Sequence, residues 1–248
     1  MKKLFHLNFT KDTAIGLTGG ILVILLSLCM NFFPGTGLID TAMSILLRDV
    51  LMILVIGFWG VFHYVLVIKK ESLACLGFHK KKLWLSLILN LIFAVCLLFG
   101  FMRGGEKVHF TYSTMCAVSY ILVAGIFEMV FIYGFLRYIF EKAFGIIPAI
   151  FLTSIFYSLH HAGFQPEFTK LFFVGMMYVA VYYITQNLFI IFPFFWGVGA
   201  IWDVLANSTA GESIANTTSF IVAICVAVGM LCIWIYYHHL SKHYPKRS

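Results

Sequence analysis

Charged side chains are scarce in this sequence. Of its 248 residues, only 11% are Asp, Glu, Lys or Arg, whereas 62% are hydrophobic, and the mean hydropathy is +0.97. A soluble domain carries about 25% charged residues. The sequence also lacks internal repeats, a low-complexity tail and the period-two alternation of a membrane barrel strand. These absences exclude an ordinary soluble domain, a repeat protein and a membrane barrel.

Long apolar runs occupy most of the chain instead. A membrane-spanning helix needs about 20 predominantly apolar residues, and several segments reach that length. We predict eight spans, at residues 15–33, 50–68, 84–102, 114–138, 146–162, 168–186, 188–206 and 218–238. The sequence therefore predicts an all-α polytopic membrane protein, a bundle of about eight transmembrane helices within one membrane domain, 1–248.

The basic residues are distributed unevenly among the segments that connect these spans. With the N-terminus inside, thirteen of the 17 Lys and Arg residues fall on the cytoplasmic side. The positive-inside rule then places both termini in the cytoplasm. The net charge of +7 is explained by this orientation and by contact with lipid headgroups, so the lipid bilayer is an expected partner and nucleic acid is not.

Cysteine and zinc-peptidase motifs are also missing. The six cysteines form no CxxC pair, and most of them lie inside predicted spans, so we expect small apolar residues rather than a disulfide framework or a zinc site. No HExxH motif occurs, which excludes the usual zinc-peptidase helix.

Ionisable residues divide the chain into two parts. The helices of residues 14–113 are almost purely apolar, and His63 is the only ionisable group expected within the second span. The part 114–207 contains the polar centre, and 218–238 forms the last helix. We expect Arg137 to mark the cytoplasmic edge and the run FPFFWGVGAIW to form a lipid-facing aromatic belt.

Glu128 lies in the middle of a predicted span, where a charge costs roughly 2.5–3.5 kcal/mol on insertion scales. The turn EKAFGII makes the fourth and fifth spans a hairpin, with Glu128 about 14 Å and His160 about 18 Å from the turn. Asp203 falls at a similar depth, although Pro193 is expected to kink its helix. The three side chains are therefore predicted to form one cluster inside the bundle.

A carboxylate and an imidazole that share one water can deprotonate it and direct it at a carbonyl group. Glu128 and His160 are the predicted catalytic pair, with Asp203 as a further catalytic or polar group. No organic cofactor is required. A divalent metal such as zinc is an open alternative, and it would use Glu128 and His160.

Three short motifs resemble those of the CPBP intramembrane proteases. This family includes the type II CAAX prenyl endopeptidases and the bacterial Abi proteins linked to bacteriocin processing and self-immunity. Glu128 followed by MVFIYGFL resembles the first motif, EExxxRGxL, and FYSLH, which ends at His160, matches the second motif, FxxxH. GAIWD, which ends at Asp203, is similar to the third, HxxxN or HxxxD. The resemblance covers about residues 70 to 207.

The resemblance implies an eight-helix bundle in a bacterial cell membrane and a peptide substrate that can be prenylated. It also implies that Glu128 and His160 activate a water for peptide hydrolysis. The sequence departs from the motifs at Met129, Tyr133 and Gly199, where the family has glutamate, arginine and histidine. Glutamate at 129 and arginine at 133 would form an ion pair, because residues four apart share one helix face. Replacing both residues by uncharged ones therefore leaves no unpaired charge in the membrane.

The loss of the third-motif histidine at Gly199 removes a donor that would stabilise the transition state. Tyr133, Trp202 and His161 are candidates to replace it, and Phe156, one turn before His160, is a support or packing residue. Two other functions stay open. One is an inert relative that binds a peptide or confers bacteriocin immunity, and the other is a small proton-coupled transporter.

Overall fold

The computed structural model describes residues 3–34, 37–79, 82–104, 108, 110–206 and 214–243. These residues form helices and no strand. The helical elements, with 3₁₀ and π-helical stretches labelled η, are α1 (Lys11–Cys29), η1 (Met30–Phe32), α2 (Leu38–Ser44), η2 (Ile45–Gly60), η3 (His63–Ile68), η4 (Leu73–Leu76), α3 (Leu83–Gly104), α4 (Tyr112–Phe127), η5 (Glu128–Leu136), α5 (Arg137–Phe144), α6 (Ile146–Leu159), α7 (Phe168–Thr185), η6 (Ile190–Phe195), α8 (Trp196–Ala206) and α9 (Thr217–His243).

Six helices among the described residues are long and apolar enough to cross a membrane, which confirms the all-α polytopic fold. They are Lys11–Phe32, Leu38–Ile68, Leu83–Gly104, Tyr112–Phe144, Phe168–Thr185 and Thr217–Leu240. Two further apolar helices, Ile146–Leu159 and Ile190–Ala206, are shorter. The predicted number of eight full-length spans is therefore not reached. The single membrane domain of residues 1–248 stays a prediction.

The two shorter helices end or break at particular residues. The helix Ile146–Leu159 ends where His160 and His161 enter a turn. In the other, Phe192 has extended backbone angles (φ −126°, ψ 133°) because it precedes Pro193, and proline disfavours helical geometry in the residue before it. The kink predicted at Pro193 is therefore present, as a break in the helix.

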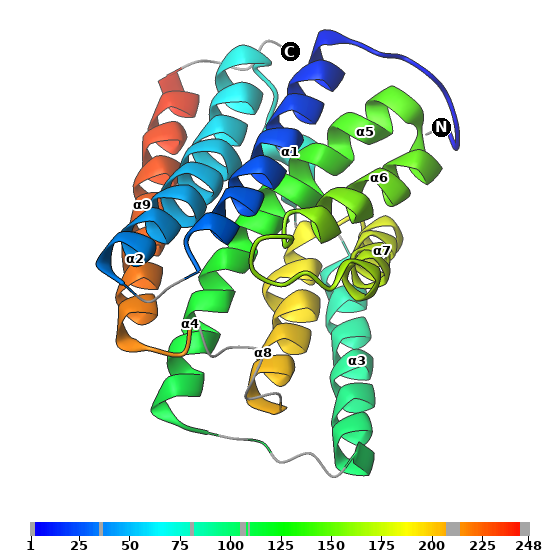
Figure 1. Cartoon of the computed structure of the whole chain (residues 1–248). Coiled ribbons are helices and arrows are strands. Elements are labelled where there is room, and N and C mark those ends of the chain that lie inside the picture. The colour runs from blue at the N-terminus through cyan, green and yellow to red at the C-terminus, as the bar shows by residue number, and fades with distance from the viewer. Residues whose placement is uncertain are drawn as a thin grey trace.

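The bundle has a buried centre and a lipid-facing edge. In the most apolar window of Tyr112–Phe144, 56% of the residues are buried, against 6% in α3. Figure 1 shows α3 at the edge of the bundle, and it shows α1 beginning and α9 ending at the same end. The helix Tyr112–Phe144 is thus surrounded by the others, which shield its polar residues from lipid.

Two glycines allow the close approaches that this packing requires. Gly145 joins α5 to α6 with φ +92°, and a Cβ there would lie 2.6 Å from the carbonyl oxygen of Leu4. Gly57 in η2 contacts the ring of Phe127, where a Cβ would overlap the aromatic carbons. A side chain at Gly57 would therefore push η2 away from the central helix.

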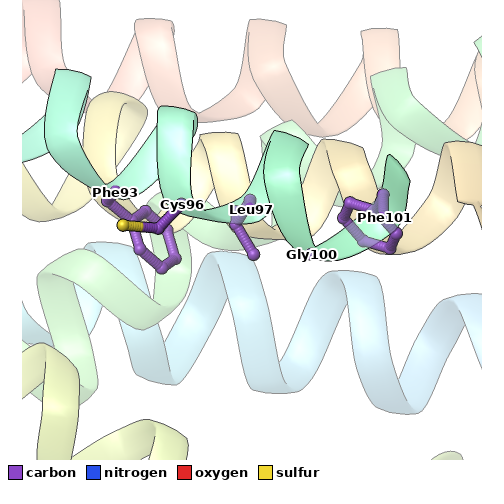
Figure 2. A pocket seen from close by; sticks show the side chains of 5 residues that line it. All are labelled: Phe93, Cys96, Leu97, Gly100 and Phe101. Carbon is purple, nitrogen blue, oxygen red and sulfur yellow. The ribbon is translucent and has the colours of Figure 1, made fainter. Parts of the chain in front are cut away.

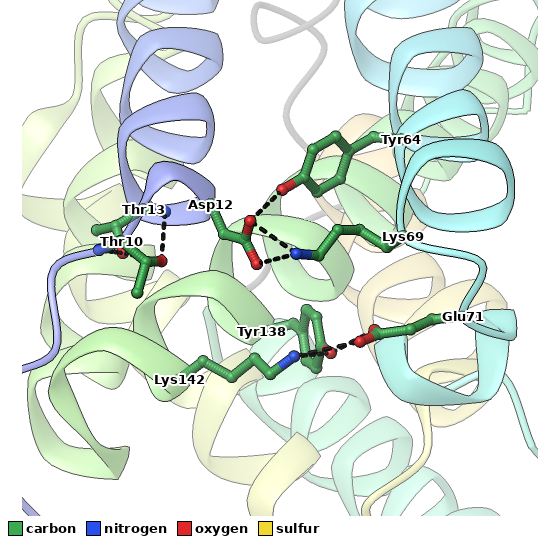
Figure 3. A network of polar contacts seen from close by, with 8 residues as sticks. All are labelled: Thr10, Asp12, Thr13, Tyr64, Lys69, Glu71, Tyr138 and Lys142. Carbon is green, nitrogen blue, oxygen red and sulfur yellow. Dashed lines mark hydrogen bonds and ion pairs between the residues drawn. The ribbon is translucent and has the colours of Figure 1, made fainter.

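Asp12 connects α1 to η3 at the end of the bundle where α1 begins (Figure 3). Its carboxylate accepts a hydrogen bond of 2.7 Å from the Tyr64 hydroxyl and forms an ion pair of 2.7 Å with Lys69. The charge of Asp12 is thus neutralised within the protein.

Glu71 makes a second polar connection at the same end (Figure 3). It accepts a hydrogen bond of 2.5 Å from Tyr138 and forms an ion pair of 3.3 Å with Lys142. Partial burial raises the pKa of Glu71, but these contacts outweigh that effect, so the pKa lies below its ordinary value. Asp12, Tyr64, Lys69, Glu71, Tyr138 and Lys142 are together called the polar end network.

Arg137 is not an edge marker, contrary to the prediction, because its side chain is only 1% exposed. Its Nε donates to the carbonyl oxygen of Tyr133 at 2.8 Å, and Nη1 pairs with Glu141 at 2.9 Å. Nη2 donates to the carbonyl oxygen of Leu76 at 3.0 Å. The guanidinium also lies 3.9 Å from the ring centre of Tyr182. We call these residues the Arg137 cluster.

The described cysteines are all free thiols, as the spacing predicts. Cys75 lies in η4, and burial followed by the nearby Glu71 carboxylate raises its pKa to about 12. A thiol with that pKa is almost entirely protonated near neutral pH, so Cys75 behaves as a small apolar residue.

Candidate active site

Glu128 lies where the central helix changes from α-helical to π-helical geometry. It is the first residue of η5, it is 6% exposed, and every residue of η5 is buried. π-Helical segments are rare, and they occur frequently at functional sites. The carboxylate is therefore held in the interior by helices on all sides, as its insertion cost requires.

Two imidazoles face this carboxylate. Oε1 of Glu128 lies 3.4 Å from Nε2 of His160 and 3.5 Å from Nε2 of His161, and both histidines are buried. The predicted meeting of Glu128 and His160 is thus present. We call Glu128, His160 and His161 the carboxylate–imidazole cluster.

The backbone of α6 fixes which nitrogen of each imidazole faces Glu128. The carbonyl oxygen of Tyr157 lies 2.6 Å from Nδ1 of His160 and 2.8 Å from Nδ1 of His161. A carbonyl oxygen only accepts, so both Nδ1 atoms carry the proton. In a neutral imidazole, the Nε2 lone pair then points toward Oε1 of Glu128. The cluster therefore gathers three acceptor atoms around a shared proton, water or cation.

The sequence predicted only a supporting role for His161, whereas the structure places it beside Glu128. Consecutive residues on an α-helix point about 100° apart, so His160 and His161 would not be expected on one face. However, α6 ends at Leu159, and both histidines lie in the following turn, with ring centres 3.9 Å apart. The helix end brings both side chains to the same carboxylate.

Trp196 was expected to belong to the aromatic belt, and that prediction is wrong. The indole is 6% exposed, and its Nε1 donates a hydrogen bond of 2.7 Å to Oε2 of Glu128. Because one carboxylate oxygen is held by Trp196, the other is directed at the two histidines. A buried indole N–H usually finds an acceptor, which is the signal that sequence reasoning could have used.

A cavity of about 380 Å³ opens beside the carboxylate–imidazole cluster. Asp203 lines it from α8 and is half-buried, so the structure brings Asp203 to the cavity. Among the described residues, the group close enough to hold one metal ion consists of Glu128, His160 and His161. Asp203 is therefore a wall residue of the cavity, and His161 takes the third place in the cluster.

The position of the missing third-motif histidine also faces this cavity. A Cβ at Gly199 would lie 3.4 Å from the Tyr178 hydroxyl. Tyr178 is buried in α7, lines the cavity, and has its ring nearly perpendicular to those of Tyr133 and Tyr157. A phenolic donor therefore lies close to the place where the family has an imidazole.

Two of the predicted support residues lie outside the cavity wall. Phe156 packs against Phe140 and α1, where a Cβ at Gly20 would overlap its ring. Tyr133 is fully buried, and its hydroxyl has no hydrogen-bond partner among the described residues. Phe156 therefore packs in the core. The ring of Tyr133 contacts the rings of Tyr157 and Tyr178, which line the cavity, so its hydroxyl lies behind these two residues.

A second, smaller cavity of about 290 Å³ lies along α3. It is lined by Phe93, Cys96, Leu97, Gly100 and Phe101, which Figure 2 shows on one stretch of the helix. Phe93 and Leu97 also line the larger cavity. The apolar helix α3, which is little buried within the protein, is thus the wall on this side of the candidate site.

Residues 109–201 match the family model described as type II CAAX prenyl endopeptidase Rce1-like. The matched segment contains the whole carboxylate–imidazole cluster, Trp196 and Tyr178. No curated protein and no solved structure matches the chain. The match confirms the resemblance to the CPBP/CAAX protease family that the three motifs indicate.

Proposed function

We propose that this protein is an intramembrane endopeptidase of the CPBP/CAAX-protease type, with a membrane-associated or prenylated peptide as its substrate. The observation that carries the proposal is a buried glutamate whose carboxylate faces two imidazoles at the wall of a cavity. The family match over the same residues supports it. Stability alone would not favour a charge at this depth.

Hydrolysis requires a water that loses a proton as it attacks the peptide carbonyl carbon. Glu128 accepts that proton, and the hydroxyl oxygen forms the new bond to carbon. The proton passes to the leaving amine when the carbon–nitrogen bond breaks, which regenerates the carboxylate. The water has one other O–H group, which donates to Nε2 of His160, while His161 lies beside it and Trp196 keeps Glu128 in place.

The tetrahedral intermediate needs donors for its negatively charged oxygen. The family position for such a donor is Gly199 here, and the Tyr178 hydroxyl near that position is the replacement that we propose. Removing a donor of this kind typically costs about 2.7–4 kcal/mol of barrier. Asp203 contributes a second polar group on the cavity wall and would orient donors or water.

The carboxylate–imidazole cluster also fits a divalent metal. Its ligand atoms lie within 4.8 Å of one another, and two histidines with one glutamate are a ligand set typical of catalytic zinc. The Nδ1 hydrogen bonds to Tyr157 are the outer contacts that orient metal-binding histidines. Glu128, His160 and His161 would hold the ion, which lowers the pKa of a bound water and polarises a carbonyl.

We further propose that the protein lies in a bacterial cell membrane with both termini in the cytoplasm. The start of α1 and the end of α9 lie at one end of the bundle (Figure 1), together with Lys69 and Lys142 of the polar end network. Arg48 and Lys170 line the cavity of the candidate site.

The test is cleavage of prenylated CAAX peptides by the purified full chain in detergent, followed by mass spectrometry. Glu128→Gln and His160→Gln are each expected to lower turnover by about 10²–10⁴-fold, because each removes a group that handles the water. Glu71→Gln, which changes a carboxylate of the polar end network outside the cavity, is the matched control and should cleave like the wild type.

Unchanged cleavage in Glu128→Gln would rule out the proposed mechanism. Peptide binding without turnover by the wild type would favour the inert relative, an alternative that the glycine at position 199 supports. Proton flux into liposomes that is lost in Glu128→Gln would instead support a transporter.

A further inference from the structure

The second membrane helix contains an ion pair just before the predicted span of residues 50–68. The helix Leu38–Ile68 begins earlier than that span, so Arg48 and Asp49, which the sequence placed in a connecting segment, lie inside it. Asp49 is 1% exposed and Arg48 is 17% exposed. A buried ion pair adds little stability over apolar residues of similar size, so its retention points to another role.

Arg48 is fixed on three sides. Its Nε and Nη2 donate to the two oxygens of Asp49 at 3.3 and 3.1 Å, and its guanidinium lies 4.6 Å from the ring centre of Tyr120. The Tyr120 hydroxyl donates a short hydrogen bond to Asp49. Both oxygens of Asp49 are thus occupied, and the hydrogen bonds of Arg48 to Asp49 use Nε and Nη2, which leaves Nη1 outside this pair.

The pair belongs to the cavity of the candidate site. Arg48 and Tyr120 both line that cavity, as do Glu128, His160 and His161. Tyr120 and Glu128 are eight residues apart on the same helix, which corresponds to about 12 Å. An extended peptide advances about 3.3–3.6 Å per residue, so about three to four residues span the distance between Glu128 and Tyr120, on whose ring Arg48 lies.

We propose that Arg48 is a specificity-determining residue that binds the C-terminal carboxylate of a peptide, about three to four residues beyond the bond at Glu128. The inference rests on the proposed function for its substrate class. A guanidinium with one free edge, held rigidly in a largely apolar cavity, suits a planar carboxylate. Asp49 and Tyr120 are positioning residues that keep the free edge of Arg48 directed into the cavity.

The test measures binding separately from turnover. The full chain with Glu128→Gln is reconstituted in phosphatidylcholine nanodiscs and titrated with a fluorescein-labelled prenylated CAAX peptide. The peptide is used in two forms, one with a C-terminal carboxylate and one with a C-terminal amide. The carboxylate form is expected to bind about 10–100-fold more tightly, since hydrogen bonds to charged groups contribute about 1.5–3 kcal/mol.

Arg48→Gln, added to Glu128→Gln, should remove this preference and leave the affinity for the amide form unchanged. Because Asp49 would then be buried without its partner, the combination Arg48→Gln/Asp49→Asn keeps the site neutral and should behave in the same way. Arg103→Gln, an exposed arginine at the end of α3, is the matched control and should retain the preference.

The proposal would be overturned if both Arg48 variants kept the same preference for the carboxylate form as the Glu128→Gln protein. It would also be overturned if neither peptide bound. Equal affinity for the two peptide forms before Arg48 is changed would also overturn it, because Arg48 would then make no contact with the C-terminal carboxylate. Failure of the wild type to cleave any peptide concerns the proposed function alone, since the affinity difference is measured without turnover.

Discussion

Two charged clusters lie on the same central helix and are built in opposite ways. The Arg137 cluster is closed, because its guanidinium donates to two carbonyl oxygens and a carboxylate and is covered by an aromatic ring. The carboxylate–imidazole cluster, nine residues earlier at Glu128, has acceptor atoms facing one another and an open cavity beside it. Saturated contacts indicate a structural role, whereas unsaturated acceptors at a cavity indicate chemistry.

The largest change in stability is expected from Arg137→Met, which removes the cation of the closed cluster. It removes the cation that pairs with Glu141 and the donor to the carbonyl oxygens of Tyr133 and Leu76, and breaking a buried pair costs about 3–5 kcal/mol. Thermal unfolding in detergent should show a clearly lowered Tm. A Tm equal to that of the wild type would contradict the structural assignment.

Trp196→Phe should reduce activity while the fold stays intact. The substitution keeps an aromatic ring and deletes the hydrogen bond from Trp196 to Oε2 of Glu128. A hydrogen bond to a charged group contributes about 1.5–3 kcal/mol, so turnover should fall by about 10–100-fold. Because the substitution disturbs the orientation of Glu128 and not the binding of the substrate, the loss should appear in kcat more than in KM.

Glu128→Gln should barely change stability, in contrast to Arg137→Met. The amide is of similar size, can still accept the hydrogen bond from Trp196, and no longer places a negative charge in the interior. We expect the free energy of unfolding to change by less than about 1 kcal/mol, or to rise, as often occurs when an active-site charge is removed. A loss of unfolding free energy as large as that of Arg137→Met would mean that the carboxylate–imidazole cluster also has a structural role.

The smallest effect is expected at the polar end network and depends on pH. The folded-state pKa of Glu71 is lowered, so its contribution to stability is present above the pKa of an unfolded glutamate, about 4.3, and is lost as pH falls through the folded-state pKa. Glu71 is partly exposed, so the contribution is under about 1 kcal/mol. Tm measured from pH 6 to pH 3 should fall less in Glu71→Gln than in the wild type.

Glu128 and His160 could be predicted from the sequence because depth in a helix follows from counting residues. Each lies a fixed rise from the turn between α5 and α6, so their similar depth needs no knowledge of packing. Trp196 and Arg137 could not be assigned correctly, because their roles depend on which way their helices are rotated. Asp49 was missed because the helix begins at Leu38, before the apolar run that marks it in the sequence.

The sequence by itself determined that this chain forms membrane helices and that Glu128 must be shielded from lipid, because both follow from the free energy of placing each side chain in hydrocarbon. Only the tertiary structure decided which groups shield it. His161 reaches Glu128 through a helix end and Trp196 through a helix broken at Pro193, whereas Arg48 joins the wall of the same cavity from the part of the chain that appeared almost purely apolar. Insertion energies depend on local composition, whereas helix rotation and contact between distant segments depend on packing throughout the bundle.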